Sequence, residues 1–201
     1  MGVRQVRKQA TRERVLVAAR ELFEEVGYEE ATVREIARRA GVSVGSVFTT
    51  FSGKAAILSQ VMADRLEALF DELDQVLSHL RGSTADRLRS IMAVQYSFET
   101  RRLRLFMAYI GASYSWAPGD DITPLGRNPG MRQMLAQTLR SGIERGEVRA
   151  DADIDTFTDL LLAAYVWNYR LAYHEGALVE DLTRLMDHQI GVLFDGIATR
   201  G

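Results

Sequence analysis

The sequence of 201 residues contains no cysteine and only three prolines. Without cysteine, the chain can form neither a disulfide framework nor a thiolate metal site. Its longest apolar run, residues 160–167, is too short to cross a bilayer, and its first residues lack the apolar segment of a signal peptide. Alternating β-branched runs are also missing, so a β-sheet is not expected. Together these absences predict an all-α, cytoplasmic protein with no membrane partner.

The sequence also lacks the motifs of a catalytic or metal site. Its three histidines, at positions 79, 174 and 188, are scattered, and no two of them lie one helical turn apart. No phosphate-binding glycine loop and no nucleophile elbow occur. Asp120 and Asp121 could bind a cation, but two adjacent carboxylates without further ligands are typical of a solvated loop. The sequence therefore predicts no enzyme activity, no cofactor and no metal site.

The clearest local pattern covers residues 31–54, which read ATVREIARRAGVSVGSVFTTFSGK. Thr32 offers an N-cap hydroxyl, and Glu35, three residues later, can return the hydrogen bond, so the two predict a capping box at a helix start. Gly41 can adopt a positive φ and end that helix, and Ser43 can cap a second one. A helix, a glycine turn and a second helix predict a helix-turn-helix, which can place a rigid helix in a DNA major groove.

The second of these helices has a distinct inner face. Val47 and Phe51 lie four residues apart and are expected to point inward, while an upstream amphipathic helix at residues 12–26 braces the pair. The side chains nearer the outer and leading surfaces are candidates for entering the groove: Val44, Gly45, Ser46, Phe48, Thr49 and Thr50.

Across residues 11–58, the order and spacing of LFEEVGYEEATVREIARRAGVS, GSVFTTF and the lysine of SGKAAIL resemble the TetR family of bacterial transcriptional regulators. The resemblance implies a helix-turn-helix DNA-binding domain at residues 1–54 and a helical effector-binding and dimerisation domain at residues 55–201. It further implies a sequence-specific regulator of double-stranded DNA, a ligand-responsive repressor rather than an activator. Such a regulator acts as a homodimer on a near-palindromic operator, with the last two helices of each subunit forming the dimer interface.

The resemblance also assigns DNA contacts to particular residues. Thr32 and Ser43 occupy helix starts that meet DNA phosphates in this family, as suits the positive end of a helix. Lys54 occupies the position of the family's phosphate-binding lysine.

Three positions depart from the family pattern. Relatives usually carry tyrosine where this chain has Phe48, histidine where it has Thr50, and often a polar residue where it has Val44. Each lost neutral hydrogen bond is worth about 1 kcal/mol, so weaker anchoring by about ten- to a hundred-fold or more is expected without compensation. These departures leave an alternative open, a helical ligand-binding or interaction module whose DNA binding is weak and degenerate.

Charge is distributed unevenly along the chain. Residues 1–54 carry 10 Lys and Arg against 7 Asp and Glu, a net charge of +3, and the total of −2 leaves −5 for the remainder. Basic residues between positions 4 and 14 account for most of this excess and could reach phosphates or the minor groove. A solvated, disordered leader is the alternative interpretation of the same segment.

The rest of the chain also has helical periodicity. Helices are expected at residues 55–80, 84–101, 103–114, 131–145, 153–175 and 179–198. All three prolines fall between residues 118 and 129, which predicts a loop at residues 116–130, either a lid over a pocket or a mobile connector.

A small-molecule effector site in the body helices is implied by the family. Candidate lining residues are Met92, Tyr96, Phe106, Tyr109, Trp167 and Asn168, although each taken singly also fits a packed core. Asn168 interrupts an apolar stripe, and a role in fixing helix register is favoured over orienting an effector. No basic cluster marks these helices, so the effector is expected to be apolar or aromatic.

Overall fold

A computed structural model describes residues 3–77, 79–114 and 124–199. The α-helices in these ranges are α1 (Val3–Glu25), α2 (Val33–Ala40), α3 (Val44–Phe48), α4 (Lys54–Leu77), α5 (Thr84–Thr100), α6 (Leu103–Ser113), α7 (Pro129–Glu144), α8 (Ile154–Glu175) and α9 (Val179–Asp195). A 3-10 helix, η1 (Leu125–Arg127), precedes α7. No strand forms within these ranges, and the all-α prediction is confirmed. None of the helices described is long and apolar enough to cross a membrane.

The chain divides by its contacts into two units. Counting described residues only, the first covers residues 3–67 and 104–114, and the second covers residues 68–77, 79–103 and 124–199. Helix α4 begins in the first unit and ends in the second, and α6 belongs to the first apart from its initial residue.

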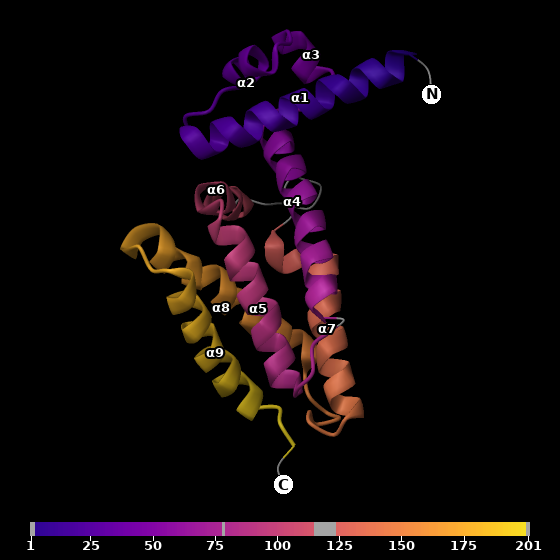
Figure 1. The fold of residues 1–201 in the computed structure, drawn as a ribbon, viewed down its shortest axis with the longest axis vertical. Coiled ribbons are helices and arrows are strands. Elements are labelled where there is room, and N and C mark those ends of the chain that lie inside the picture. The colour runs from indigo at the N-terminus through magenta and orange to yellow at the C-terminus, as the bar shows by residue number, and fades with distance from the viewer. Residues whose placement is uncertain (1–2, 78, 115–123, 200–201) are drawn as a thin grey trace. The chain divides into compact units, whose positions relative to one another are not determined.

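In the first unit, α2 and α3 pack against α1 and against each other (Figure 1). Helix α1 begins at Val3, earlier than the expected start at residue 12, so the interpretation of residues 3–11 as a disordered leader is wrong. That segment contains good helix formers and neither glycine nor proline, but it lacks the apolar stripe by which a helix is recognised. The buried side chains of this small core come from all three helices and from the segment between α3 and α4: Val15, Leu16, Ala19, Leu22, Phe23, Ile36, Ala37, Ala40, Val47 and Phe51.

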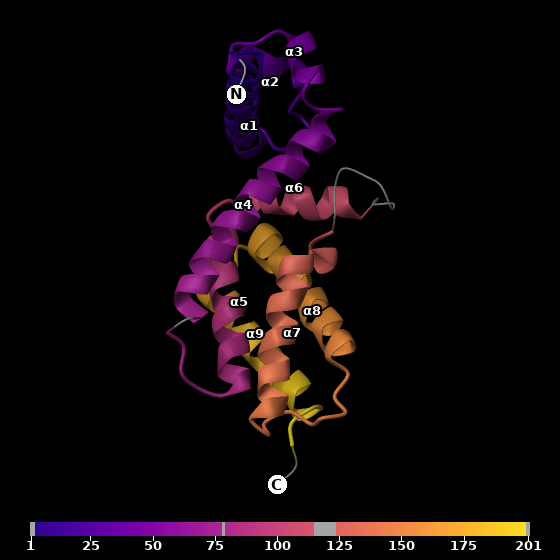
Figure 2. The same ribbon diagram turned by 90° about the vertical axis from the view of Figure 1, so that its right-hand side faces the viewer.

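The second unit is a helical bundle. Helix α5 packs against α7 and α9, and α8 packs against the same two helices (Figure 2). Leucine, isoleucine and methionine fill the space between them: Leu88, Ile91, Met92, Leu135, Leu139, Leu161, Leu162, Leu182, Met186 and Ile190. Burial of each such side chain contributes about 1.5–3 kcal/mol, so the packing of these side chains is the main source of stability in the unit.

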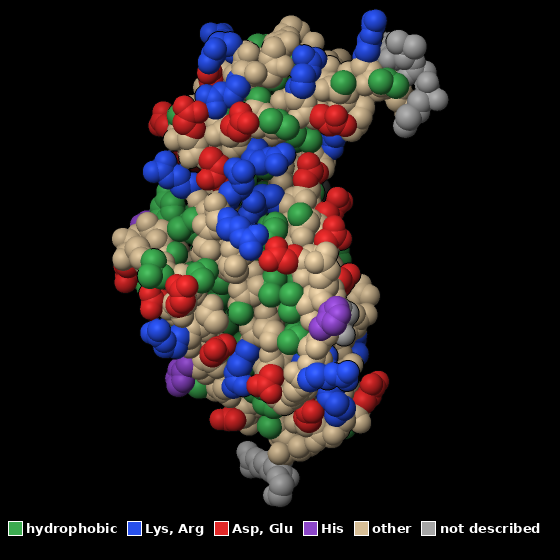
Figure 3. Space-filling view, in the orientation of Figure 1, with side chains coloured by type: hydrophobic (Ala, Val, Ile, Leu, Met, Phe, Trp, Pro, Cys, Tyr) green, Lys and Arg blue, Asp and Glu red, His purple; other side chains and the backbone are tan. Residues whose placement is uncertain are grey.

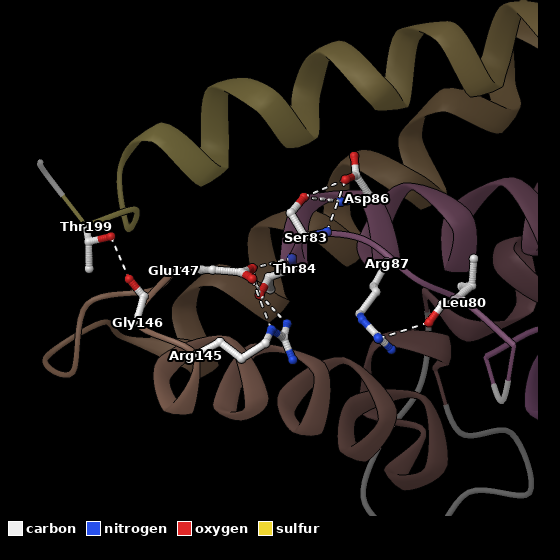
Figure 4. A network of polar contacts seen from close by, with 9 residues as sticks. All are labelled: Leu80, Ser83, Thr84, Asp86, Arg87, Arg145, Gly146, Glu147 and Thr199. Carbon is white, nitrogen blue, oxygen red and sulfur yellow. Dashed lines mark hydrogen bonds and ion pairs between the residues drawn. The ribbon is translucent and has the colours of Figure 1, made fainter.

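A polar network joins the start of α5 to the segment after α7 (Figure 4). The Glu147 carboxylate accepts hydrogen bonds from the Thr84 backbone N–H at 2.5 Å and the Thr84 hydroxyl at 2.6 Å. Arg145 Nε donates to the other carboxylate oxygen of Glu147 at 3.0 Å. Hydrogen bonding by Thr84 and Arg145 lowers the pKa of Glu147 from 4.5 to about 2. The network therefore holds the α7–α8 connection against the first turn of α5.

The chain end packs on the same connection. Helix α9 ends at Asp195 rather than at the expected residue 198, because the following residues leave the helix and pair with residues 146–149. Val148 and Ala198 form an isolated antiparallel bridge, and the Thr199 hydroxyl donates to the Gly146 carbonyl at 2.8 Å.

The predicted loop is described only in part. Residues 115–123, with Asp120 and Asp121, lie outside the described residues, so the lid hypothesis stays a prediction. Helix α7 begins at Pro129, two positions before the expected start at residue 131, with Asn128 as its N-cap. Proline is well suited to the first helical position, where no N–H partner is needed.

Candidate nucleic-acid interface

The first helix of the motif starts as predicted, but only half of the capping box forms. Thr32 Oγ1 accepts a hydrogen bond from the Glu35 backbone N–H at 3.1 Å. The expected return bond is absent, and the Glu35 carboxylate pairs instead with Arg38 at 2.9 and 2.5 Å. Two charged hydrogen bonds from the Arg38 guanidinium stabilise the Glu35 carboxylate more than one hydrogen bond from the backbone N–H of the N-cap would. Its hydrogen bonds lower the pKa of Glu35.

The turn between the two helices has the geometry that the sequence predicts. Gly41 adopts φ 64° and ψ 39°, a left-handed conformation that side chains other than glycine rarely take. The Val42 backbone N–H then donates to the Ala37 carbonyl at 3.0 Å and closes the end of α2. This reversal fixes the direction in which α3 leaves the motif.

Helix α3 is short and held by its own polar groups. The Ser43 hydroxyl accepts from the Ser46 backbone N–H at 3.1 Å and lies 2.8 Å from the Ser46 hydroxyl. Val47 and Phe51 are buried, as expected for the inner face.

The opposite side of α3 is open to solvent. Val44 is 38% exposed and Phe48 is 54% exposed, and Gly45 and Thr49 are exposed with them. These four residues are called the α3 surface here. Ser46 and Thr50, also predicted to contact DNA, are half-buried beside it. The local geometry thus brings the predicted candidates of this helix together on and beside one face.

Lys54 has a structural role that the sequence did not reveal. Its ammonium donates to the carbonyl oxygens of Tyr28 at 2.6 Å and Glu29 at 3.1 Å, and it lies 4.3 Å from the centre of the Tyr28 ring. Two of its three N–H groups are therefore engaged in tying the start of α4 to the α1–α2 turn.

Basic side chains surround the α3 surface. Figure 3 shows Lys and Arg along the outer edge of the α1–α3 region and Asp and Glu on the flank of α1 away from that edge. Arg7, Lys8 and Arg34 are exposed, while the Arg12 guanidinium lies 5.2 Å from the centre of the Phe51 ring. An open hollow of about 510 Å³ between the first turns of α1 and Thr50 has Lys8 and Arg12 in its lining.

The residues predicted for an effector pocket belong to both units of the chain, and their role in binding an effector stays a prediction. In the second unit, Asn168 Nδ2 donates to the Tyr96 hydroxyl at 3.0 Å and to Gln189 Oε1 at 2.7 Å. The Tyr96 ring centre lies 5.0 and 5.1 Å from those of Tyr165 and Tyr169, and burial raises the pKa of Tyr96. Asn168 thus connects three helices, which supports the structural role favoured from the sequence.

Of the other predicted pocket residues, Met92 and Trp167 belong to the same unit as this pair, and Phe106 and Tyr109 belong to the first unit. Met92 is buried on α5, and Phe106 and Tyr109 are buried on α6. Trp167 is 60% exposed on α8, with the Arg170 guanidinium 4.1 Å from its ring centre, and so it does not line an interior site in this subunit.

A hollow that the sequence did not suggest lies between α4, the start of α5, and α7. This α4–α7 groove has a volume of about 420 Å³, and its lining includes Phe70, Leu77, Arg87, Gly130, Met134 and Gln137. An added Cβ on Gly130 would come within 2.9 Å of two ring atoms of Phe70, so glycine is needed there to accommodate the ring. Arg87 donates to the Leu80 carbonyl at 3.0 Å, and its Nε has no hydrogen-bond partner among the described residues.

Comparison with known proteins decides the family. The family model described as "Bacterial regulatory proteins, tetR family" matches residues 15–61. The HTH-type transcriptional regulator SrpR of Pseudomonas putida is 30% identical over 146 residues, which is 73% of this chain and 67% of SrpR. The chain belongs to the TetR family. The HTH-type transcriptional repressor KstR2 of Mycolicibacterium smegmatis is 29% identical to this TetR-family protein over 145 residues, 72% of this chain and 70% of KstR2.

A solved structure agrees with this membership. FadR of Thermus thermophilus, a TetR-family transcriptional repressor solved in complex with lauroyl-CoA, has a TM-score of 0.76 and 26% identity, with 94% of this chain and 96% of FadR covered. The resemblance inferred from the sequence is thus confirmed, and this TetR-family protein is a DNA-binding transcriptional regulator. Its relatives are named as regulators rather than enzymes. Within the described residues, no three His, Cys, Asp or Glu side chains are grouped to hold a metal ion.

Two features of this TetR-family regulator escaped the sequence reasoning for the same reason. The bonds of Lys54 join residues 25 and 26 positions apart, and the α4–α7 groove joins segments still farther apart. A faint signal of the groove was present, because Gln133, Gln137 and Ser141 form a polar stripe at helical spacing on α7.

Proposed function

We propose that this TetR-family regulator represses transcription by binding, as a homodimer, a near-palindromic operator with the α3 surface of each subunit in the major groove. The observation that carries this proposal is the exposure of Val44 and Phe48 on a helix whose opposite face is buried in the core through Val47. A helix held in this way can enter the groove without rearrangement of its own unit. Because its partner is bacterial DNA, the site of action is the cytoplasm.

The predicted contacts divide into two classes. Thr32, Ser43 and Lys54 lie at helix starts and are assigned to phosphates, which position the protein without selecting a sequence. Val44, Gly45, Ser46, Phe48, Thr49 and Thr50 lie on or beside the α3 surface and are assigned to the major groove. Exposed arginine and lysine side chains of α1 and α2 supply further attraction to the backbone and offset the polar groups missing at positions 44, 48 and 50.

The dimer interface is assigned to α8 and α9. Leu160 and Trp167 lie two turns apart on the outer side of α8, and they are 51% and 60% exposed. Leu178 and Val192 are exposed before and on α9. Large apolar side chains repeated along one helix face of a regulator are typical of a subunit interface.

The effector site is assigned to the α4–α7 groove. Phe70, Leu77 and Met134 suit an apolar portion of a ligand, and Arg87 suits an anionic or hydrogen-bond-accepting group. Binding there would weaken DNA binding by linkage, typically by about 1–3 kcal/mol, and DNA would weaken ligand binding equally.

The Tyr96–Asn168 pair in the second unit is the second candidate effector site. Its polar groups lie in an otherwise apolar interior, which is where an effector's polar group would be oriented. An effector there would have to displace Gln189 from Asn168.

Selection of duplexes from a random pool, followed by gel shifts over a salt series, tests the DNA proposal. Specific retention of a near-palindromic duplex with a steep salt dependence is expected, and native mass spectrometry should find two subunits on it. Weak binding that is equal for all duplexes would instead support the degenerate interaction module.

Native mass spectrometry with lauroyl-CoA and with free laurate as probes tests the effector site. We expect Arg87→Ala to weaken binding at least tenfold and Asn168→Ala to leave it unchanged. The reverse pattern would move the site to the Tyr96–Asn168 pair.

A further inference from the structure

The stretch between Arg39 and Lys54 contains no charged and no amide side chain. Its 14 residues are alanine, glycine, valine, serine, threonine and phenylalanine only, and they include the whole of α3. In the major groove, guanine is recognised mainly by Arg or Lys, adenine by Asn or Gln, and cytosine by Asp or Glu. None of these pairings is available to α3.

The hydroxyl groups of α3 and its caps are directed back onto the helix. Thr49 Oγ1 donates to the Gly45 carbonyl at 2.8 Å. Thr50 Oγ1 donates to the Ser46 carbonyl at 3.3 Å. The hydroxyls of Ser43 and Ser46 share a hydrogen bond of 2.8 Å, which uses one of their two hydrogens. Donation from Thr49 or Thr50 to a base would therefore require breaking a bond that the helix already makes, and the serine pair keeps one hydrogen for donation.

The groups that remain available on the α3 surface are apolar. Val44 and Phe48 lie one helical turn apart, so their side chains are neighbours on the exposed side, and Gly45 places no side chain between them. In Figure 3 the top edge of the α3 region is mostly tan, with blue Lys and Arg side chains close to it. The basic groups can attract phosphates, and the apolar pair can distinguish one base from another.

We infer that Val44 and Phe48 recognise the C5 methyl groups of thymine, so that each operator half-site is defined chiefly by the positions of its thymines. The methyl group is the apolar feature that a base pair presents in the major groove, and it is absent from unmodified guanine, cytosine and adenine. This inference rests on the proposed function, because it requires the α3 surface to enter the groove.

Replacement of thymine by deoxyuridine tests the inference directly. This change removes the methyl group and keeps the base pairing and the O4 acceptor. In an operator selected with the full-length protein, each contacted thymine should lower affinity about fourfold when replaced, as expected for one buried methyl. Fluorescence anisotropy at one fixed salt concentration measures the change, and thymines in the flanking sequence serve as the control on the DNA.

Variants of the protein assign the methyl groups to side chains. Phe48→Ala should weaken binding to the thymine operator and abolish the effect of deoxyuridine at its own positions, and Val44→Ala should do the same at others. Both side chains are exposed, so unchanged thermal unfolding is expected. Val17→Ala, at an exposed valine on α1, is the matched control and should preserve the full deoxyuridine effect.

The outcomes separate this inference from the function on which it rests. Specific binding that is insensitive to deoxyuridine overturns the methyl recognition and leaves the DNA-binding proposal intact. A deoxyuridine effect of full size in both Phe48→Ala and Val44→Ala also overturns it, because the methyl groups would then act through DNA shape. Failure to select any duplex overturns both proposals.

Discussion

Replacing Glu147 by glutamine should destabilise the second unit through loss of one charge. Its carboxylate accepts two hydrogen bonds from Thr84, at 2.5 and 2.6 Å, and one from Arg145 at 3.0 Å. Hydrogen bonds to a charged group contribute about 1.5–3 kcal/mol when shielded from water. The Glu147 side chain is 30% exposed, so solvent screening reduces this contribution, and we expect a loss of ~2 kcal/mol at pH 7.

The pH dependence follows from the lowered pKa. Glu147 titrates at about 2 in the folded protein against an ordinary value of 4.5, so the folded state favours the carboxylate. A group with a depressed pKa stabilises the protein above its unfolded value, and this stabilisation disappears as the pH falls through the folded value. The difference between the native protein and Glu147→Gln should therefore be constant above pH 6 and fall by about half near pH 3.

Urea unfolding at fixed protein concentration, repeated between pH 3 and pH 8, measures this difference. Glu144→Gln is the matched control, because it removes the same charge from an exposed position on the same segment and should change stability by less than about 0.5 kcal/mol. An equal loss at pH 3 and pH 7 would refute the electrostatic explanation. An equal loss in the Glu144 variant would show that the charge acts without the network.

Three other substitutions have defined outcomes. Gly142→Ala would place a Cβ against the Thr84 side chain in a packed core, so a loss of about 1–3 kcal/mol is expected in urea unfolding, and none would mean that the helices separate freely. Trp167→Glu should shift the dimer toward monomer in analytical ultracentrifugation at micromolar concentration, because a charge would enter the proposed apolar interface; an unchanged dimer would exclude that surface. Lys54→Ala should lower the unfolding midpoint, because two carbonyl groups lose their hydrogen-bond donor. The same variant should reduce the salt slope of DNA binding by about one, and an unchanged slope would leave the lysine only its structural role.

The helix-turn-helix could be predicted from the sequence because its signals are local. Thr32, Gly41 and Ser43 act on backbone groups within a few residues, and all three have the predicted conformations. The prediction that Glu35 returns a hydrogen bond to the helix start was wrong, because Arg38 binds the same carboxylate. Even short-range predictions therefore fail where two partners lie within reach.

Contacts between distant segments could not be predicted in this way. Thr84 and Glu147 are 63 residues apart, and no property of either residue alone indicates the other. Helix α8 has large apolar side chains on several sides, so periodicity alone did not show whether Trp167 lines a pocket or faces solvent. For this reason Trp167 was assigned to a pocket, whereas it lies on the surface proposed for dimerisation.

Recognition of methyl groups would also explain why this regulator needs two subunits. A methyl contact discriminates less than a two-point hydrogen bond to a base. At about fourfold for each methyl, a half-site with three contacted thymines would be preferred about 60-fold over one that lacks them. That ratio is below the range of about 10³–10⁷ by which regulators prefer their operators. Two half-sites bound together multiply to about 4,000-fold, which enters the range. An effector that prevents the two copies of Val44 and Phe48 from engaging at once would then remove most of the specificity without altering either α3 surface.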